Sequence, residues 1–304
     1  MHDLVKKFSS VTAVDHLSFE IKEGEVFGFL GPNGAGKTTT IRMLATLISP
    51  TDGHAIVGGY DISKESLKVR ETIGILTENP SLYERLSAYE NLDFFAEAYG
   101  VSKQDREKRI KELLDFFGLW DRKGEKVGNF SKGMKQKLSI ARALVHEPPI
   151  LFLDEPTAGL DPAAAKEIRD LIESMSRKEK RTILLCTHHL EDAQRLADRV
   201  MMIDKGRMIA IGTPEELQDK VAGKLKLEIV LTEVPATMIT SLKRLGTVSG
   251  VEQIDNRLII SLKDSASTPE IVRMIALRGG NILSVNLLRP SLEDVYMKLI
   301  GDKN

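Results

Sequence analysis

The fold is decided by an apolar run and the glycine-rich loop that follows it, Val26-Phe27-Gly28-Phe29-Leu30-Gly31-Pro32-Asn33-Gly34-Ala35-Gly36-Lys37-Thr38-Thr39. The loop matches G-x-x-x-x-G-K-[ST], and its surroundings predict a buried strand before it and a helix after it. Glycines let main-chain N–H groups turn toward phosphate oxygens, Lys37 can reach the β and γ phosphates, and Thr38 can ligate Mg²⁺. A chance Lys-Thr after a glycine-rich turn is the alternative. We predict that residues 31–39 bind ATP, because a second motif supports the site.

That second motif is an apolar strand ending in two carboxylates, Ile150-Leu151-Phe152-Leu153-Asp154-Glu155. Side chains alternate along a strand, but the backbone turns at its carboxyl end, so both acids can reach a nucleotide. We expect Asp154 to hold Mg²⁺ and Glu155 to accept or polarise a proton of the attacking water. Alone, the pair could be ordinary surface acids. Together with the phosphate loop, it predicts ATP hydrolysis with Lys37 and Glu155 as catalytic residues.

Composition limits the partners and the compartment. Of the 304 residues, 42% are hydrophobic and 29% charged, which is ordinary for globular domains. The 43 basic and 44 acidic residues nearly cancel, so no general field favours nucleic acid, and we predict no nucleic-acid partner. No apolar run approaches the ~20 residues that span a bilayer, and the N-terminus has no signal-peptide pattern, so we expect a cytoplasmic chain. The single cysteine, Cys186, should lie in a buried strand.

The order of predicted elements indicates an α/β fold followed by a small α+β domain. Apolar runs alternate with amphipathic helices, which favours a mostly parallel sheet covered on both faces. A mainly polar, helical insertion occupies about residues 67–148. We place the first domain at residues 1–222 and the second at 223–304. The second has the order βαββαβ, which suggests a ferredoxin-like domain.

A third segment, Asn129-Phe130-Ser131-Lys132-Gly133-Met134-Lys135-Gln136, precedes another apolar helix. By itself, Ser131 is a good helix N-cap. Together with the two motifs above, however, this segment resembles the ATP-binding subunit of an ABC transporter, and the likeness covers about residues 1–215. The resemblance implies a P-loop NTPase cassette of the ABC type with a helical subdomain. Lys132 and the pair Met134-Lys135 depart from the usual signature, whereas Ser131 and Gly133, expected to approach phosphate, are intact.

The resemblance assigns roles to further residues. Phe8 takes the position of the aromatic residue that stacks on adenine, although alone it could be a core residue. Asp161, in the segment Ala158-Gly159-Leu160-Asp161, lies in a loop that crosses to a second subunit, although alone it could cap a helix. Glu78 stands where the family usually has a glutamine that touches Mg²⁺ and the attacking water. A carboxylate can still ligate the metal, so we expect Glu78 to be linked to Mg²⁺.

His188 resembles the family's switch histidine and is the third residue that we expect to act in catalysis. Its neighbour, His189, raises the alternative of a metal site. Adjacent side chains at a strand end are expected to diverge, and no third ligand is close in the sequence. We therefore predict no metal site at these two histidines.

The resemblance also implies how the chain works. Two cassettes would pair as a head-to-tail homodimer or with a similar cassette, with ATP at the interface and the helical insertion contacting a separate integral membrane permease. The chain would lie peripherally on the inner face of the cell membrane. The ending Pro290-Ser291-Leu292-Glu293-Asp294-Val295-Tyr296 looks like that of ATPases from the drug-resistance and sodium-efflux branch, which favours export.

Two other classes of function compete with a transport motor. One is a soluble ABC-type ATPase that acts as a mechanical or regulatory factor without a permease. The interval between Thr38 and Ser131 leaves no room for a long coiled coil, which argues against it. The other is a nucleotide sensor without turnover, and the intact Glu155 and His188 disfavour it.

Overall fold

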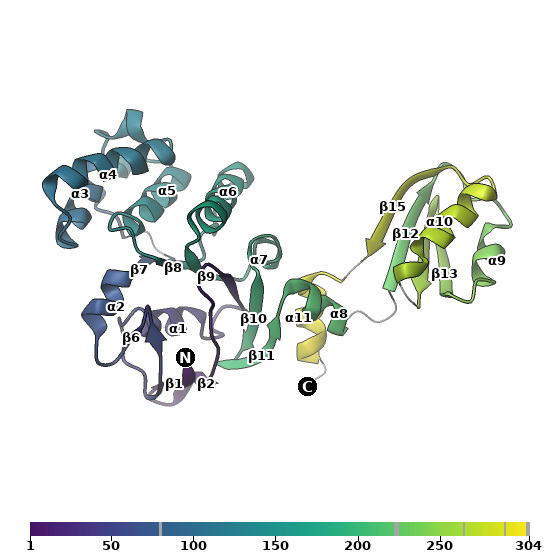
Figure 1. The fold of residues 1–304 in the computed structure, drawn as a ribbon, viewed down its shortest axis with the longest axis horizontal. Coiled ribbons are helices and arrows are strands. Elements are labelled where there is room, and N and C mark those ends of the chain that lie inside the picture. Colours follow the sequence, from purple (N-terminus) through teal and green to yellow (C-terminus); the bar gives the residue numbers. More distant parts are fainter. Residues whose placement is uncertain (79–80, 222–224, 264, 289, 302–304) are drawn as a thin grey trace. The chain divides into compact units, whose positions relative to one another are not determined.

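The computed structural model describes residues 1–78, 81–221, 225–263, 265–288 and 290–301 (Figure 1). The chain separates into two compact units, Met1–Pro214 and Glu215–Asn304. The boundary predicted between residues 222 and 223 lies outside the described residues. Within the described part of the chain, no helix is both long enough and apolar enough to span a bilayer.

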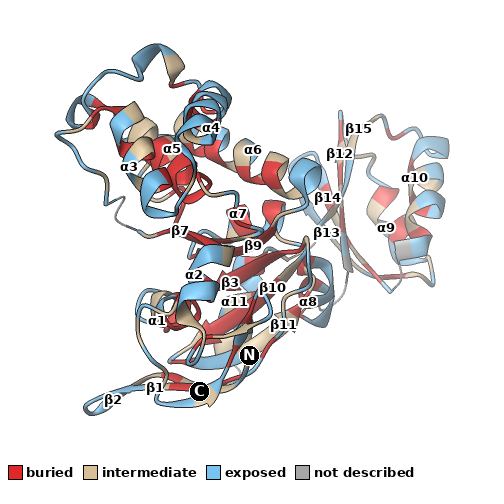
Figure 2. Cartoon of the chain, turned by 60° about the vertical axis from the view of Figure 1, so that its left-hand side comes forward, coloured by how far each residue is buried: buried red, intermediate tan, exposed pale blue. Residues whose placement is uncertain are grey.

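A six-stranded sheet forms the centre of the first unit. Its strands, in spatial order, are β11 (Arg207–Gly212), β10 (Arg199–Asp204), β3 (Val26–Leu30), β9 (Thr182–Thr187), β8 (Ile150–Asp154) and β7 (Ile73–Leu76). All neighbours pair in parallel except β10 and β11. Every residue of β3 and β9 is buried (Figure 2). The continuous apolar runs therefore became strands buried on both faces, and the predicted fold class is confirmed.

Helices and a smaller sheet cover the central sheet and give each face its own core. Leu151 and Leu153 of β8 belong to one core, and Phe152, between them, belongs to the other, as the alternation of side chains along a strand requires. Cys186 is fully buried in the second core. The elements that complete this unit are α1 (Lys37–Leu44), α6 (Pro162–Glu179), α7 (Leu190–Leu196), and the antiparallel strands β2 (Val11–Leu17), β1 (His2–Phe8) and β4 (Asp52–His54).

The helical insertion is shorter than the predicted range of about 67–148. That range begins inside α2 (Ser66–Thr72), which a hairpin of β5 (Ile56–Val57) and β6 (Tyr60–Asp61) precedes, and it contains β7, an edge strand of the central sheet. The remaining helices are α3 (Ala88–Ala98), α4 (Lys103–Phe116) and α5 (Lys132–Ala143), with short 3-10 turns at Trp120–Arg122 and Val127–Asn129. These helices pack on one another, and α5 also packs against β7 (Figure 1).

The second unit contains a four-stranded antiparallel sheet. Its order is β13 (Val248–Ile254), β14 (Arg257–Leu262), β12 (Leu225–Leu231) and β15 (Ile282–Leu288). With α9 (Met238–Lys243) and α10 (Thr268–Leu277), the chain order is βαββαβ, as predicted, and a 3-10 turn occupies Ser265–Ser267. The other helices are α8 (Pro214–Val221) and α11 (Leu292–Gly301), which opens with a capping box in which the Asp294 main-chain N–H donates to the Ser291 hydroxyl.

Candidate active site

The glycine-rich loop joins the carboxyl end of β3 to the first turn of α1, where a parallel sheet presents ligand sites. Gly34 and Gly36 have φ angles of 81° and 105°, which side chains rarely adopt. A Cβ at Gly36 would lie only 2.4 Å from the Ala13 carbonyl oxygen. Glycine at position 36 is therefore required both by the backbone angle and by the close approach of β2.

The Lys37 ammonium is held over this loop. The side chain is 6% exposed, and its Nζ donates to the carbonyl oxygens of Gly31, at 2.6 Å, and Pro32, at 3.2 Å. The same atom lies 3.6 Å from Glu155 Oε1. A cation and a carboxylate from two motifs far apart in sequence thus meet at one place.

The two acids stand where β8 ends and the chain turns sharply. Glu155 has a φ of 52°, in the left-handed region that non-glycine residues seldom occupy, and such strain is common at functional sites. This turn is what lets consecutive residues reach the same region. Asp154 is 1% exposed and hydrogen-bonds with the Thr38 side chain, while its Oδ1 is buried without a hydrogen-bond partner. A divalent cation is the ligand that such a buried oxygen fits.

Burial raises the pKa of the Asp154 carboxyl, and the negative charges of Glu155 and Glu78 raise it further, whereas Thr38 and Lys37 oppose the rise. The charged form that Mg²⁺ needs is therefore held at a cost in the nucleotide-free chain. Mg²⁺ would offset that cost by neutralising the clustered carboxylates.

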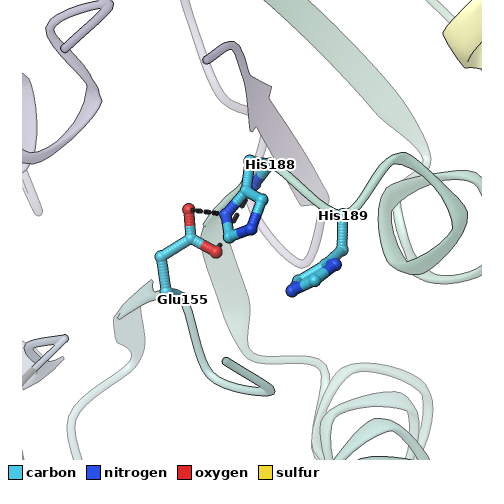
Figure 3. A group of neighbouring side chains, drawn as sticks. All are labelled: Glu155, His188 and His189. Atoms are coloured by element: carbon cyan, nitrogen blue, oxygen red, sulfur yellow. Dashed lines mark hydrogen bonds and ion pairs between the residues drawn. The ribbon is translucent and has the colours of Figure 1, made fainter. Parts of the chain in front are cut away.

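Glu155 is fixed by the strand next to β8 and by the residues that follow it. Its Oε1 lies 2.9 Å from His188 Nδ1, and its Oε2 accepts a hydrogen bond from the His188 main-chain N–H at 3.4 Å (Figure 3). The same Oε2 also accepts from the Thr187 hydroxyl at 3.3 Å. The His188 side chain is 40% exposed, so its other nitrogen can face a ligand. The predicted base and the predicted switch histidine are therefore in direct contact.

One cavity of about 270 Å³ collects most of the predicted site. Its lining contains Pro32, Asn33, Gly34, Gly36, Lys37, Thr38, Thr39, Glu78, Glu155 and His188, together with Ala13 and Ala158. No motif in the sequence predicts a role for Ala13. Gly31, Ala35 and Asp154 are buried and are not among the residues that line the cavity.

The described residues that line this cavity do not include Phe8, Ser131, Gly133 or Asp161. Phe8 is 47% exposed at the end of β1, which excludes a core role. Ser131 caps α5 by accepting from the Met134 N–H, and Asp161 caps α6 by accepting from the N–H groups of Ala163 and Ala164. Phe8 remains a prediction for adenine stacking, and Ser131, Gly133 and Asp161 remain predictions for a paired site.

The structure also shows supporting residues that the sequence did not reveal. Gln136, in α5, donates to the Pro156 carbonyl oxygen at 2.7 Å and so ties the segment at Ser131 to the residue after Glu155. Thr157 follows Pro156, and its hydroxyl donates to Asp192 at 2.5 Å; Asp192 also accepts from Arg169 at 2.8 Å. These bonds join distant segments, which have no local sequence pattern.

The prediction that the His188 and His189 side chains diverge, with no third ligand near them, is wrong. The rings of His188 and His189 do not diverge, since their centroids lie 4.1 Å apart at an interplanar angle of 36°. Glu155 supplies the missing third group, and one ligand atom from each of the three residues lies within 4.8 Å of the others (Figure 3). The sharp turn after β8 brings the carboxylate there.

Comparison with known proteins matches two family models, ABC transporter over residues 14–158 and the DrrA1-3-like C-terminal domain of ATP-binding proteins over residues 212–300. The chain is 34% identical to the linearmycin resistance ATP-binding protein LnrL of Bacillus subtilis (strain 168), covering 98% of this chain and 97% of that protein. It is 36% identical to the bacitracin transport ATP-binding protein BcrA of Bacillus licheniformis, covering 98% and 96%.

A solved structure of an ATP-binding cassette resembles a large part of this chain. A dimeric ATP-binding cassette in a post-hydrolysis state, bound to ADP and Pi, superposes with a TM-score of 0.64 at 27% identity, covering 70% of this chain and 97% of that chain. The chain therefore shares the fold of an ATP-binding cassette as well as its sequence motifs. The chain therefore belongs to the ABC transporter family, as one of its ATP-binding and ATP-hydrolysing subunits.

Proposed function

We propose that this chain is one of a pair of cassettes that hydrolyse Mg-ATP on the cytoplasmic face of a membrane and drive export through a separate permease. The observation that carries the proposal is that Lys37, Thr38, Glu155 and His188 all line one cavity at the carboxyl ends of β3 and β8. The finer roles of these residues are inferred from their geometry.

Each group has a distinct task in this proposal. Lys37 and the loop N–H groups hold the β and γ phosphates. Thr38, Asp154 and Glu78 are the oxygen ligands for Mg²⁺, which, when bound, neutralises charge on the phosphate oxygens. Glu155 takes a proton from the attacking water, and His188, 2.9 Å from it, fixes the orientation of the carboxylate.

Pairing explains why part of the site lies elsewhere. Ser131 and Gly133 stand at the N-terminus of α5, where main-chain N–H groups favour an anion, yet they do not line the cavity of their own chain. In a head-to-tail pair, they would face the γ phosphate bound to the other chain, and Phe8 would stack on adenine. Loss of the γ phosphate then removes the charge that joins the two halves.

The surface that fits the permease is an exposed aromatic pair on the helical insertion. Tyr83 and Phe94 are 48% and 47% exposed, and their rings pack edge to face at 5.2 Å. Arg142, in α5, donates to the Ser81 carbonyl oxygen at 2.8 Å. A movement of the segment that contains Ser81 and Tyr83 would therefore be transmitted to α5, whose N-cap at the opposite end is Ser131.

Export is supported by the DrrA1-3-like C-terminal domain and by full-length relatives named for linearmycin resistance and bacitracin transport. The transported compounds would then be antibiotics or similar amphipathic molecules. Cells that make the Glu155→Gln chain should accumulate more of such a compound than cells with the wild-type chain. Equal accumulation would contradict export.

The test of the motor itself is Glu155→Gln in the purified chain. The amide keeps the size of the side chain, and Lys37 retains its two carbonyl acceptors, so ATP should still bind. Turnover should fall by about 10²–10⁴-fold, the usual contribution of a general base, and Mg-ATP should trap a dimer visible by light scattering. The exposed Glu191→Gln is the matched control and should hydrolyse normally.

Normal hydrolysis by a monomeric Glu155→Gln chain would refute both the base and the pairing. The membrane partner is tested separately by pull-down from a detergent extract. An integral membrane protein should accompany the wild-type chain and be lost with Tyr83→Ser plus Phe94→Ser, while ATP hydrolysis persists. A soluble partner instead would favour the mechanical or regulatory alternative.

A further inference from the structure

Two histidines and one carboxylate converge at the end of β9. Glu155 Oε1 and His188 Nδ1 are 2.9 Å apart, the His188 and His189 rings lie 4.1 Å apart, and one ligand atom from each residue lies within 4.8 Å of the others (Figure 3). We propose that Glu155, His188 and His189 bind a Zn²⁺-like transition-metal ion, and that the bound ion stops ATP hydrolysis.

The geometry is close to what such an ion needs. Zn–N and Zn–O bonds of about 2.0–2.2 Å place tetrahedral ligand atoms about 3.3 Å apart. Rotation of the two imidazoles would bring the ligand atoms to that spacing, opening the 2.9 Å contact and closing the longer ones; both histidines are exposed, so their rings can turn. The backbone between them is fixed, because the His189 N–H donates to the Thr187 hydroxyl at 2.9 Å.

The donor set selects the class of metal. Two imidazoles and one carboxylate suit Zn²⁺ and are used with an open position in zinc enzymes, whereas Mg²⁺ prefers oxygen ligands only. The oxygen ligands proposed for Mg²⁺, which are Thr38, Asp154 and Glu78, are different residues. Mg²⁺ at the phosphate loop should therefore not displace the ion from the histidines.

The neighbouring charge does not prevent binding. Lys37 Nζ lies 3.6 Å from Glu155 Oε1 and would have to release it. It can do so because it keeps the carbonyl oxygens of Gly31 and Pro32, at 2.6 and 3.2 Å. The other oxygen of Glu155 remains hydrogen-bonded to the Thr187 hydroxyl. Only one carboxylate oxygen is needed by the ion.

Inhibition follows from which groups the ion occupies. An ion on Glu155 takes the lone pair that would accept the proton of water, and an ion on His188 takes the nitrogen that contacts the carboxylate. This consequence rests on the proposed roles of Glu155 and His188 in hydrolysis. Binding of the ion does not rest on them, so the two parts can fail separately.

The binding test uses the untagged full-length chain without nucleotide, titrated with Zn²⁺ by calorimetry or against a chromophoric zinc indicator. His189→Gln removes one ligand from an exposed position and should weaken binding by at least about tenfold, since loss of even an outer-shell partner costs a metal site about 10–100-fold. The matched control is His54→Gln, because His54 belongs to another pair of exposed, neighbouring histidines: its ring stacks on that of His2, with the ring centroids 5.4 Å apart. This control should bind Zn²⁺ as the wild-type chain does.

The functional test measures ATP hydrolysis at saturating Mg-ATP with free Zn²⁺ held constant by a chelator buffer. Zn²⁺ should inhibit the wild-type and His54→Gln chains and spare His189→Gln, which should hydrolyse normally without Zn²⁺. Equal Zn²⁺ affinity in the wild-type and His189→Gln chains would overturn the site. Binding that depends on His189 without inhibition would overturn the consequence. A chain that binds Zn²⁺ through His189 but never hydrolyses ATP would refute the proposed function and leave the metal site standing.

Discussion

The phosphate loop can be tested by adding one methyl group at Gly36. A Cβ there would lie 2.4 Å from the Ala13 carbonyl oxygen, which belongs to the backbone of β2 and cannot swing away as a side chain can. The φ angle of 105° adds strain for any residue with a Cβ. Gly34→Ala is the matched control, since its φ is 81° but no atom lies within 4 Å of the added Cβ.

The two variants separate strain from collision. Both should lose about 1–3 kcal/mol of stability from backbone strain. Gly36→Ala should lose about 2 kcal/mol more, the middle of the usual range for forcing atoms into a packed site. For a unit of this size, each kcal/mol lowers the melting temperature by about 2–4 °C, so Gly36→Ala should melt about 4–8 °C below Gly34→Ala.

The chain offers a selective probe for this measurement. Its single tryptophan, Trp120, lies in the first unit, so thermal unfolding followed by tryptophan fluorescence reports on that unit and not on the second. Movement of the loop should also displace Lys37 and weaken ATP binding more in Gly36→Ala than in Gly34→Ala. Equal melting temperatures, with equal ATP affinities, would refute the close approach of β2 to the loop.

Three further changes test other parts of the site and chain. Burial raises the pKa of the Asp154 carboxyl in the folded chain above its ordinary value of 3.8, so ionisation of this group destabilises the folded chain as pH rises from 3.8 through the raised value. Asp154→Asn should therefore raise the melting temperature of the nucleotide-free chain at neutral pH and abolish stabilisation by Mg-ATP. A lower melting temperature would contradict this. Glu78→Gln removes a charge beside the γ phosphate and should tighten ATP binding at low Mg²⁺, measured with a fluorescent nucleotide, and change the Mg²⁺ dependence of hydrolysis; an unchanged Mg²⁺ dependence would exclude a role for Glu78 at the metal. Truncation after Pro214 should weaken ATP-induced pairing measured by light scattering, whereas unchanged assembly and activity would count against a role for the second unit in dimer support.

The central sheet could be predicted because its strands carry their signal locally. β3, β8 and β9 are short apolar runs that end at chemically distinctive residues, and burial on both faces demands such runs. The predicted helical insertion wrongly takes in β7, because this strand has only four residues and lies between two helical stretches. The sheet formed by β1, β2 and β4 depends on pairing between distant segments, which no local pattern encodes.

The same distinction holds at the site. Lys37, Asp154 and Glu155 follow from motifs in which residue type and spacing are fixed by phosphate and metal chemistry. The bond from Gln136 to the Pro156 carbonyl joins residues on different elements and could not be foreseen. The predicted divergence of His188 and His189 is wrong because the contact of the two rings with Glu155 depends on the turn after β8, where Glu155 takes an uncommon φ of 52°.

The most direct measurement is a crystal structure of the Glu155→Gln chain with ATP and Mn²⁺ in place of Mg²⁺, in which anomalous scattering locates the metal. We predict the triphosphate against the loop N–H groups and Lys37, the manganese peak between Thr38 and Asp154, and Ser131 of the partner subunit at the γ phosphate. Nucleotide bound away from the loop, or a manganese peak remote from Asp154, would contradict the proposed ATP site.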